Sequence, residues 1–363
     1  MRINRASREL ADAMTVSSHS ILAQLGWRPF FAEQVPAEES QNCQPVRVMS
    51  VHRGRVTVSG EGIEDSISSS VPVQRGAEDR PTVGDWLLID RSSRSLVRIL
   101  DRTSLLKRPT PGDDRRVQLI AANVDTLFVV SSCDQDFNVA RLERYLVLAR
   151  EVGVRPVVVL TKADLSPAPE RMVDAARRLQ AGLRVELVDG RHSTSADRLA
   201  GYCGIGETVA LVGSSGVGKS TLVNTLKGSE SIATRAVREY DGKGRHTTTV
   251  RQMHRLAGDE DGLGAEAGGW LVDTPGMREL QMSEVASGVI DVFDDVTVVT
   301  LDCRFANCTH SNEPGCAIGI AMAEGSLDAA RVERWRKLAR EDTENSDAVS
   351  VRRVRRGMAA NKR

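Results

Sequence analysis

The chain has 363 residues, which is enough for two or three domains with hydrophobic cores of their own. Its 49 Lys and Arg balance its 49 Asp and Glu, so the overall charge argues for no particular partner. No apolar run approaches the roughly 18 residues that a membrane span needs, and six cysteines are too few for a disulfide scaffold. These features predict a cytoplasmic protein without a membrane partner.

The first hundred residues suggest an extension followed by a small β-domain. Residues 1–44 show a weak helical pattern that ends in a polar stretch, so we expect a partly ordered extension. Residues 45–108 carry short alternating apolar runs separated by Gly, Pro and Ser, which suits a five-stranded OB-type barrel. This range has eleven Lys and Arg against eight Asp and Glu. The mild excess would suit binding to an RNA backbone, although composition alone favours an ordinary solvated surface.

From about residue 117 the pattern changes to alternating strands and helices. The apolar run at 156–160 predicts a buried strand, and the segment at 141–152 predicts an amphipathic helix. This βαβ order indicates a mostly parallel sheet covered by helices.

The strand at 156–160 ends in Thr161, Lys162, Ala163 and Asp164, which resembles the N-K-x-D element that reads guanine in GTPases. A carboxylate there can accept hydrogen bonds from N1 and N2 of guanine, and adenine lacks both donors. The T-K-x-D pattern is weak alone, but its place at the end of a parallel strand beside a phosphate loop strengthens it. Since Thr161 replaces the usual Asn, one polar contact to the base or to the loop is expected to differ.

A phosphate-binding loop follows the next apolar run. It fits G-x-x-x-x-G-K-[ST] and consists of Gly213, Ser214, Ser215, Gly216, Val217, Gly218, Lys219, Ser220 and Thr221. The glycines let backbone N–H groups turn towards the phosphates, and the following helix adds the positive end of its dipole. Lys219 can reach the β- and γ-phosphates, and the Ser220 hydroxyl can bind Mg²⁺. A glycine-rich turn with a surface lysine is the alternative, which the strand–loop–helix context disfavours.

Two later segments supply further groups for a nucleotide site. The segment at 243–249 carries His246 and three threonines, of which we assign Thr249 to Mg²⁺. A D-x-x-G element follows, in which Asp273 can hold a Mg²⁺-bound water and the Gly276 N–H can contact the γ-phosphate. The next residue, Met277, is apolar and cannot orient the attacking water, so His246 is the candidate catalytic residue.

The order of these elements is circularly permuted. Ordinary GTPases run from the phosphate loop through the switch threonine and D-x-x-G to N-K-x-D, whereas Thr161–Asp164 precedes Gly213–Thr221 here. Permutation is tolerated where the old termini were close together. As a consequence, the D-x-x-G segment leads straight into the C-terminal part of the chain.

The C-terminal part carries a metal-ligand pattern. Cys303, Cys308, His310 and Cys316 have the spacing C-x4-C-x-H-x5-C, which completes a closed tetrahedral shell for one structural Zn²⁺ per chain. A helix with Ser326 as its N-cap is expected next. The last residues, 351–363, contain six Lys and Arg and no acid, as expected of a segment that binds nucleic acid or of a solvated tail.

Together these features resemble the RsgA (YjeQ) family of circularly permuted bacterial GTPases. Besides the permuted order and the zinc spacing, matching stretches include Val83-Gly84-Asp85-Trp86, Leu142-Glu143-Arg144-Tyr145-Leu146 and Gly244-Arg245-His246-Thr247-Thr248-Thr249. The resemblance implies GTP hydrolysis stimulated by the small ribosomal subunit, late in its maturation, with contacts to ribosomal RNA. One departure is Asp189-Gly190, which stands where the family has a Ser-Ala element near guanine.

We therefore expect a monomeric multi-domain protein that binds GTP or GDP, uses Mg²⁺ with GTP and leaves the small subunit on hydrolysis. Its predicted parts are an extension (1–44), an OB-type RNA-binding domain (45–108), an α/β permuted P-loop GTPase domain (109–282) and a C-terminal α-helical zinc domain (283–363). Either His246 or the ribosome would position the attacking water. Two alternatives remain open: an ATPase that uses the same loop, and an RNA-binding scaffold that holds GTP without hydrolysing it.

Overall fold

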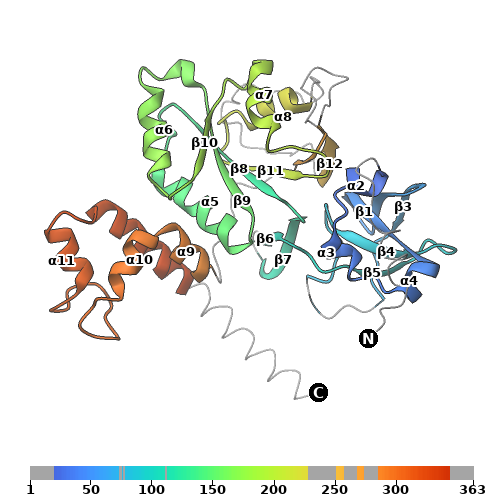
Figure 1. Cartoon of the computed structure of the whole chain (residues 1–363), viewed down its shortest axis with the longest axis horizontal. Helices are drawn as coiled ribbons and strands as arrows, with labels where there is room; N and C mark the ends of the chain where they lie inside the picture. Colours follow the sequence, from blue (N-terminus) through green and yellow to red (C-terminus); the bar gives the residue numbers. More distant parts are fainter. Residues whose placement is uncertain are drawn as a thin grey trace, which may run out of the picture.

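The computed structural model describes residues 20–72, 76, 78–110, 113–227, 251–256, 268–273 and 285–343. One sheet runs through the molecule, with the N-terminal strands at one end and the C-terminal helices beyond the other (Figure 1). Several sequence predictions lie outside the described residues, namely those on His246, Thr249, Gly276, Met277 and the basic tail 351–363. Among the helices described, none combines the length and apolarity that a bilayer span requires.

The N-terminal part of the sheet is antiparallel. Its strands pair in the order β3-β2-β1-β4-β5 and are β1 (Cys43–His52), β2 (Arg55–Gly60), β3 (Ile63–Ser68), β4 (Trp86–Asp90) and β5 (Leu96–Ile99). Val56 and Val58 alternate along β2, so both point to one face, where they cluster with Val46, Val48 and Leu87. Within the described residues no pairing of β3 with β5 closes these strands, so the OB-type barrel stays a prediction.

Three short helices precede β1, and residues of the first two and of the loops that follow them cover the other face of these strands. They are α2 (Ile21–Gln24), α3 (Pro29–Ala32) and α4 (Ala37–Asn42). Trp27 and Phe31 pack with Trp86 of β4, and the Trp27 and Trp86 ring centroids are 4.8 Å apart. The neighbouring Leu87 faces the valine cluster instead, so β4 is buried on both faces. Residues 20–42 are thus an ordered part of the predicted extension.

The central part of the sheet is mostly parallel, as the βαβ pattern predicts. Its parallel strands are, in spatial order, β10 (Arg184–Leu187), β9 (Arg155–Thr161), β8 (Thr126–Ser132), β11 (Thr208–Val212) and β13 (Trp270–Asp273). Next to β13 lies the antiparallel β12 (Arg251–Arg255), which also pairs with β1 through Gln252 opposite Ser50. The two parts of the sheet are therefore continuous. A hairpin of β6 (Leu105–Thr110) and β7 (Asp113–Ala122) leads into β8.

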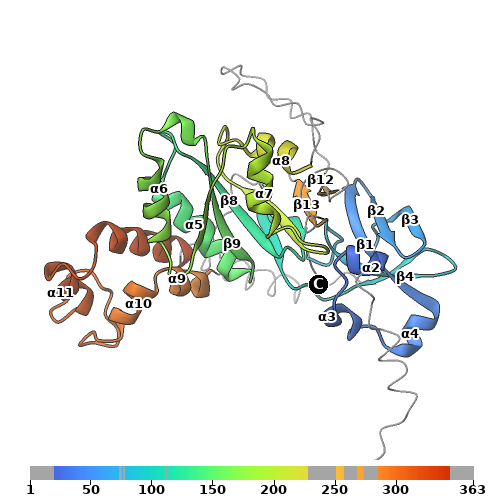
Figure 2. The ribbon, with the colours of Figure 1, turned by 45° about the horizontal axis from the view of Figure 1, so that its top comes forward.

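Helices cover both faces of the parallel strands (Figures 1 and 2). On one face lie α5 (Val139–Glu151) and α6 (Pro169–Arg177), and on the other lie α7 (Ser193–Ala200) and α8 (Lys219–Lys227). The residues of β8 alternate between the two layers. Leu127 and Val129 join the cluster of α5, whereas Phe128 and Val130 join the cluster of α8. The sheet therefore has a hydrophobic core on each side.

The C-terminal helices follow one another beside the parallel sheet, and the first and last of the four contact α5 (Figure 1). They are α9 (Ala286–Val292), α10 (Asp294–Thr300), α11 (Ala317–Ala323) and a helix at 329–343. Gly288 permits close approach, because a Cβ there would lie 2.2 Å from the carbonyl oxygen of Val147 in α5. Glu143 of α5 is fully buried and accepts hydrogen bonds from Arg331 at 3.1 Å and Arg334 at 2.6 Å. Burial raises the pKa of Glu143, and the two guanidinium groups offset part of this rise.

The start of the last helix differs from the prediction. The Ser326 hydroxyl does not cap it but donates to the carbonyl oxygen of Ala321 at 3.1 Å, closing the turn after α11. The carboxylate of Asp328 accepts the Ala330 N–H at 2.7 Å instead, so the helix begins at 329, two residues later than a Ser326 cap implies. The prediction was wrong because the preceding helix takes up the serine hydroxyl.

Replacing Glu143 by alanine should lower the free energy of unfolding by about 3 kcal/mol, because two largely buried guanidinium groups would lose their carboxylate. Urea-induced unfolding followed by tryptophan fluorescence measures this. Glu170→Ala, which removes an exposed acid from α6, is the control and should change little. Equal unfolding midpoints for both variants would show that these ion pairs do not hold the C-terminal helices on α5.

Candidate nucleotide site and metal cluster

The segments predicted to bind nucleotide meet at one edge of the sheet. Because β8, β9, β10 and β11 are parallel, their carboxyl ends lie together, and open α/β sheets bind ligands at this edge. Thr161 ends β9 and Lys162–Asp164 follow it, Asp189–Arg191 follows β10, and the phosphate loop follows β11. Asp273 ends β13, the other neighbour of β11, and its side chain lies outside the described residues.

The phosphate loop has the backbone that its glycines predict. Gly213, Gly216 and Gly218 have φ of 147°, 82° and 94°, values in the left-handed region that favours glycine. A Cβ at Gly213 would lie 2.2 Å from the carbonyl oxygen of Val130, so no side chain fits there. Lys219 begins α8, and its Nζ donates to the carbonyl oxygens of Gly213, at 2.7 Å, and of Ser214. The loop is thus curled under its own ammonium group.

Thr161 connects the expected guanine element to the phosphate loop. Its side chain is buried, and its Oγ1 donates to the carbonyl oxygen of Val217 at 2.6 Å. The Thr161 side chain also lies beside Gly218, where a Cβ would be 3.5 Å from its Oγ1 and 3.8–3.9 Å from two of its carbons. The sequence left open whether Thr161, which replaces the usual Asn, contacts the base or the phosphate loop. Its hydroxyl contacts the loop.

Replacing Thr161 by valine keeps the shape but leaves the Val217 carbonyl without its donor. An unpaired buried carbonyl costs about 1–3 kcal/mol, so we expect the affinity for GDP to fall about tenfold. Isothermal titration calorimetry measures it. Thr161→Ser, which keeps the hydroxyl, should bind GDP nearly as tightly as the unchanged protein, and an equal loss in both variants would contradict the hydrogen-bond explanation.

Two residues near the site were not found from the sequence. Asp134, just after β8, forms an ion pair with Lys162, whose Nζ lies 3.1 Å from Asp134 Oδ2. Burial alone would raise the pKa of Asp134, but the Ser132 hydroxyl, a backbone N–H and Lys162 together lower it. Arg141, in the first turn of α5, donates to the Ser214 hydroxyl. The signal for Asp134 was an acid directly after a buried strand, as at Asp164.

The expected base-reading carboxylate is paired with an arginine. Asp164 lies in a short 3-10 turn, η1 (Ala163–Leu165), and its side chain is about half exposed. Its Oδ2 is 3.2 Å from the Arg191 guanidinium, which also forms a bidentate pair with Asp189. The Arg191 hydrogen bond is the main reason that the pKa of Asp189 falls to about 2. The Asp189-Gly190 element therefore does lie beside the guanine element.

The four predicted metal ligands come together in the C-terminal part. The ligand atoms of Cys303, Cys308, His310 and Cys316 all lie within 4.8 Å of one another. The Cys303 Sγ is 3.4 Å from the His310 Nδ1. Three thiol groups and one imidazole at this spacing can surround a tetrahedral ion, and such a donor set suits zinc.

The surrounding chain holds these ligands in place. The carboxylate of Glu313 accepts the Thr309 N–H at 2.8 Å and the Ser311 N–H at 2.9 Å, which fixes the turn around His310. The His310 ring packs on Trp335 of the last helix, with centroids 5.6 Å apart. The cluster is therefore anchored both by its own loop and by the helix at 329–343.

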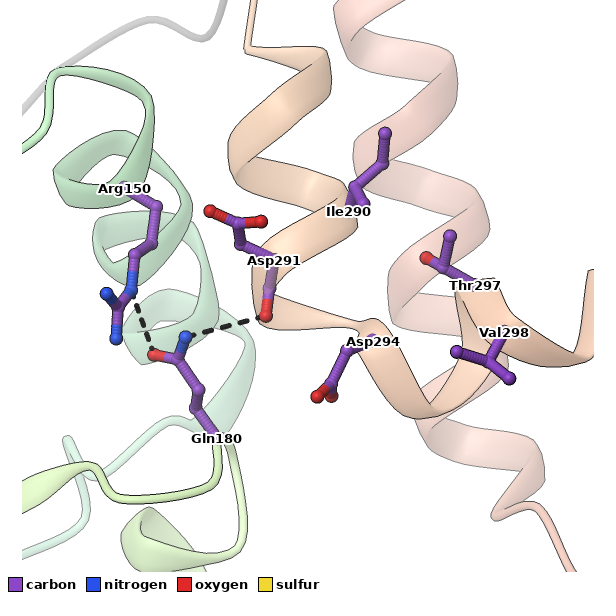
Figure 3. Close-up of a pocket in the computed structure, with 7 residues that line it drawn as sticks. All are labelled: Arg150, Gln180, Ile290, Asp291, Asp294, Thr297 and Val298. Carbon is purple, nitrogen blue, oxygen red and sulfur yellow. Dashed lines mark hydrogen bonds between the residues drawn. The ribbon is translucent and has the colours of Figure 1, made fainter.

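A hollow elsewhere in the molecule is not part of this edge. It has a volume of about 320 Å³ and lies between α5, the turn after α6 and helices α9 and α10 (Figure 3). Gln180 bridges its walls, accepting from Arg150 at 3.3 Å and donating to the carbonyl oxygen of Asp291 at 3.4 Å. No residue of the nucleotide segments lines it. The hollow therefore belongs to the packing interface between α5 and the C-terminal helices.

Comparison with known proteins identifies relatives along nearly the whole chain. A family model described as RsgA GTPase matches residues 99–283. A protein of Mesorhizobium japonicum, named small ribosomal subunit biogenesis GTPase RsgA, is 46% identical over 94% of this chain and 95% of its own length. A Vibrio vulnificus protein, named small ribosomal subunit biogenesis GTPase RsgA 2, is 42% identical over 94% of each chain.

Two solved structures show the same fold. YjeQ from Thermotoga maritima matches with a TM-score of 0.56 and 23% identity, over 82% of this chain and 97% of its own. YloQ, described as a circularly permuted GTPase, matches with a TM-score of 0.55 and 21% identity, over 83% of this chain and 96% of its own. The predicted circularly permuted α/β fold is thereby confirmed.

Proposed function

Because the chain belongs to the RsgA GTPase family, we propose that it binds the small ribosomal subunit, hydrolyses GTP during late maturation of that subunit, and leaves it after hydrolysis. The structural observation that carries most weight is the meeting of the phosphate loop and Thr161–Asp164 at one sheet edge, joined by the Thr161–Val217 hydrogen bond. The names of the relatives support the ribosomal partner. The expected place of action is the cytoplasm, and the expected state is a monomer.

One group of residues at this sheet edge would bind the guanine base, and another would bind the phosphates. Thr161–Asp164 would hold guanine, with Asp164 accepting from N1 and N2 and the Lys162 stem lying along the base. Asp134 positions Lys162 through their ion pair. Gly213–Thr221 would hold the phosphates through backbone N–H groups and Lys219. The exposed backbone at Gly216, where a Cβ would meet nothing within 4 Å, leaves room for that anion.

Ser220, exposed at the start of α8, would bind Mg²⁺ with Thr249, and Asp273 would act through a water. A bound ion would supply positive charge to the phosphate oxygens that these residues face. The Gly276 N–H would contact the γ-phosphate. Since Met277 cannot orient water, either His246 or the small subunit would do so, and hydrolysis without the partner should be slow.

The outer parts would serve the ribosomal contact. The Cys303, Cys308, His310 and Cys316 cluster would hold one structural zinc ion that fixes the loop in front of the last helix. We divide the chain into the extension 1–44, an RNA-binding OB-type domain 45–108, the permuted GTPase domain 109–282 and the zinc domain 283–363. Ribosomal RNA would contact the outer two domains and the basic tail.

The deciding experiment measures phosphate release from GTP with and without purified small ribosomal subunits, and with large subunits as the control. We expect slow turnover alone and many-fold stimulation by small subunits only. If no GTP is hydrolysed even with small subunits present, the protein is instead an RNA-binding scaffold that holds GTP. Equal use of ATP in the same assay would instead indicate a P-loop ATPase.

A further inference from the structure

Arg191 lies on the carboxylate that is expected to read guanine. One guanidinium nitrogen, Nη2, is 3.2 Å from Oδ2 of Asp164 and 2.8 Å from Oδ2 of Asp189. The Nε is 2.9 Å from the other Asp189 oxygen. Asp189 thus binds the guanidinium through two hydrogen bonds, whereas Asp164 is contacted by a single nitrogen of the same group. A base that takes the Asp164 oxygens displaces the weaker contact and leaves the stronger one.

The loop that carries Arg191 is fixed to the helix of the phosphate loop. Thr225 of α8 donates to the carbonyl oxygen of Gly190 at 2.5 Å, and Ser195 donates to that of Asp189. The Arg191 backbone N–H also binds the Asp189 carboxylate at 3.1 Å. Arg191 is therefore held at the rim of the base position even after Asp164 turns to another donor.

We infer that Arg191 is a specificity-determining residue, whose guanidinium donates a hydrogen bond to O6 of the bound guanine. The inference rests on the proposed function, since it requires Asp164 to bind N1 and N2. On guanine, O6 is attached to the carbon next to N1, so a donor beside the Asp164 carboxylate on that side faces O6. Arginine donating to guanine O6 is a common pairing, and a charged donor makes it stronger than a neutral hydrogen bond.

The same geometry would reject adenine. Adenine carries an amino group in place of O6 and has no N1–H for Asp164. Its amino donor would face the Arg191 guanidinium, and the Asp164 carboxylate would lose both of its donors. Discrimination of this kind comes from unfavourable contacts as well as favourable ones.

The test separates this role from an ordinary surface ion pair, which contributes little. Titration calorimetry on the full chain with Mg²⁺ compares four ligands: GDP, ADP, 6-thio-GDP, in which a sulfur replaces O6, and inosine diphosphate, which lacks the N2 amino group. The variants are Arg191→Ala, Arg191→Lys, and Arg177→Ala as a matched control with an exposed arginine on α6.

For the unchanged protein and Arg177→Ala we expect tighter binding of GDP than of either analogue. Arg191→Ala should lose about tenfold in GDP affinity and bind 6-thio-GDP as it binds GDP, yet keep its preference for GDP over inosine diphosphate. The GDP affinity of Arg191→Lys should lie between those of the unchanged protein and Arg191→Ala.

Undiminished GDP binding by Arg191→Ala would overturn the inference, because O6 would then be read without this side chain. An equal loss for GDP and 6-thio-GDP would overturn it as well. If the unchanged protein itself shows no preference for GDP over ADP, the proposed function fails instead, so the two failures are distinguishable.

Discussion

Lys219→Ala should reduce subunit-stimulated GTP hydrolysis by about 100-fold or more, the usual effect of removing one preorganised charge donor from a transition state. The ammonium group lies within the curl of the loop, since it donates to the carbonyl oxygens of Gly213 and Ser214. It stands at the start of α8, where the helix dipole adds to its charge. From there its charge can act on the phosphates that the loop binds, and the assay is phosphate release with small subunits present.

The matched control is Lys227→Ala, which removes the same side chain from the other end of α8. It should keep near-normal hydrolysis, and circular dichroism should show unchanged helix content in both variants. If Lys219→Ala retains activity within a few-fold of the unchanged protein, the loop at Gly213–Thr221 does not bind the reacting phosphates, and the assignment of the whole edge would need revision.

Local patterns in the sequence predicted the parts of the site that are continuous in the chain. The phosphate loop needs glycine at three left-handed positions and a lysine at the helix start, so a short stretch carries nearly all of its geometry. The same holds for the metal cluster, whose four ligands span 303–316 and are held by a turn within that stretch. The alternation of strands and helices likewise indicated the parallel sheet, because each element buries its own apolar face.

Contacts between distant segments could not be predicted in this way. The Glu143 ion pairs join residues almost two hundred positions apart, and nothing around Glu143 in the sequence marks it as buried. Its place on α5 becomes meaningful only when the C-terminal helices cover that face. Asp134 and Arg191 also gain their roles from Lys162 and Asp164, which lie after a different strand, β9. Charge and residue type were visible for each of them, but the partner was not.

The pairing of β1 with β12 is another such contact, and it bears on how the parts communicate. β12 comes directly after the segment 243–249, which carries His246 and Thr249. Through Gln252 opposite Ser50, the strand is bonded to the N-terminal sheet as well as to β13. A displacement of β12 would therefore also displace β1, because the two strands are paired along their backbones.

Removal of the metal should unfold the segment around 303–316 while leaving nucleotide binding intact. The four ligand atoms lie within 4.8 Å of one another, only Cys316 of the four residues is buried, and Phe305 between the first two is exposed, so the ion itself is expected to hold this loop together. Apparent binding energies of structural zinc are about 10–16 kcal/mol, far more than the Glu313 turn contributes. Zinc released on denaturation should equal one ion per chain, and Cys308→Ser should release none.

Cys308→Ser should also be cut by protease within the C-terminal part, keep its GDP affinity, and lose stimulation by small subunits. Cys43→Ala is the matched control, because this cysteine lies in the N-terminal sheet, far in sequence from the cluster, and should leave the zinc content unchanged. Nucleotide binding should survive because Thr161–Asp164 and Gly213–Thr221 rest on the parallel sheet and on α8, not on the cluster. Full stimulation of a zinc-free variant would show that the cluster is dispensable for the ribosomal contact.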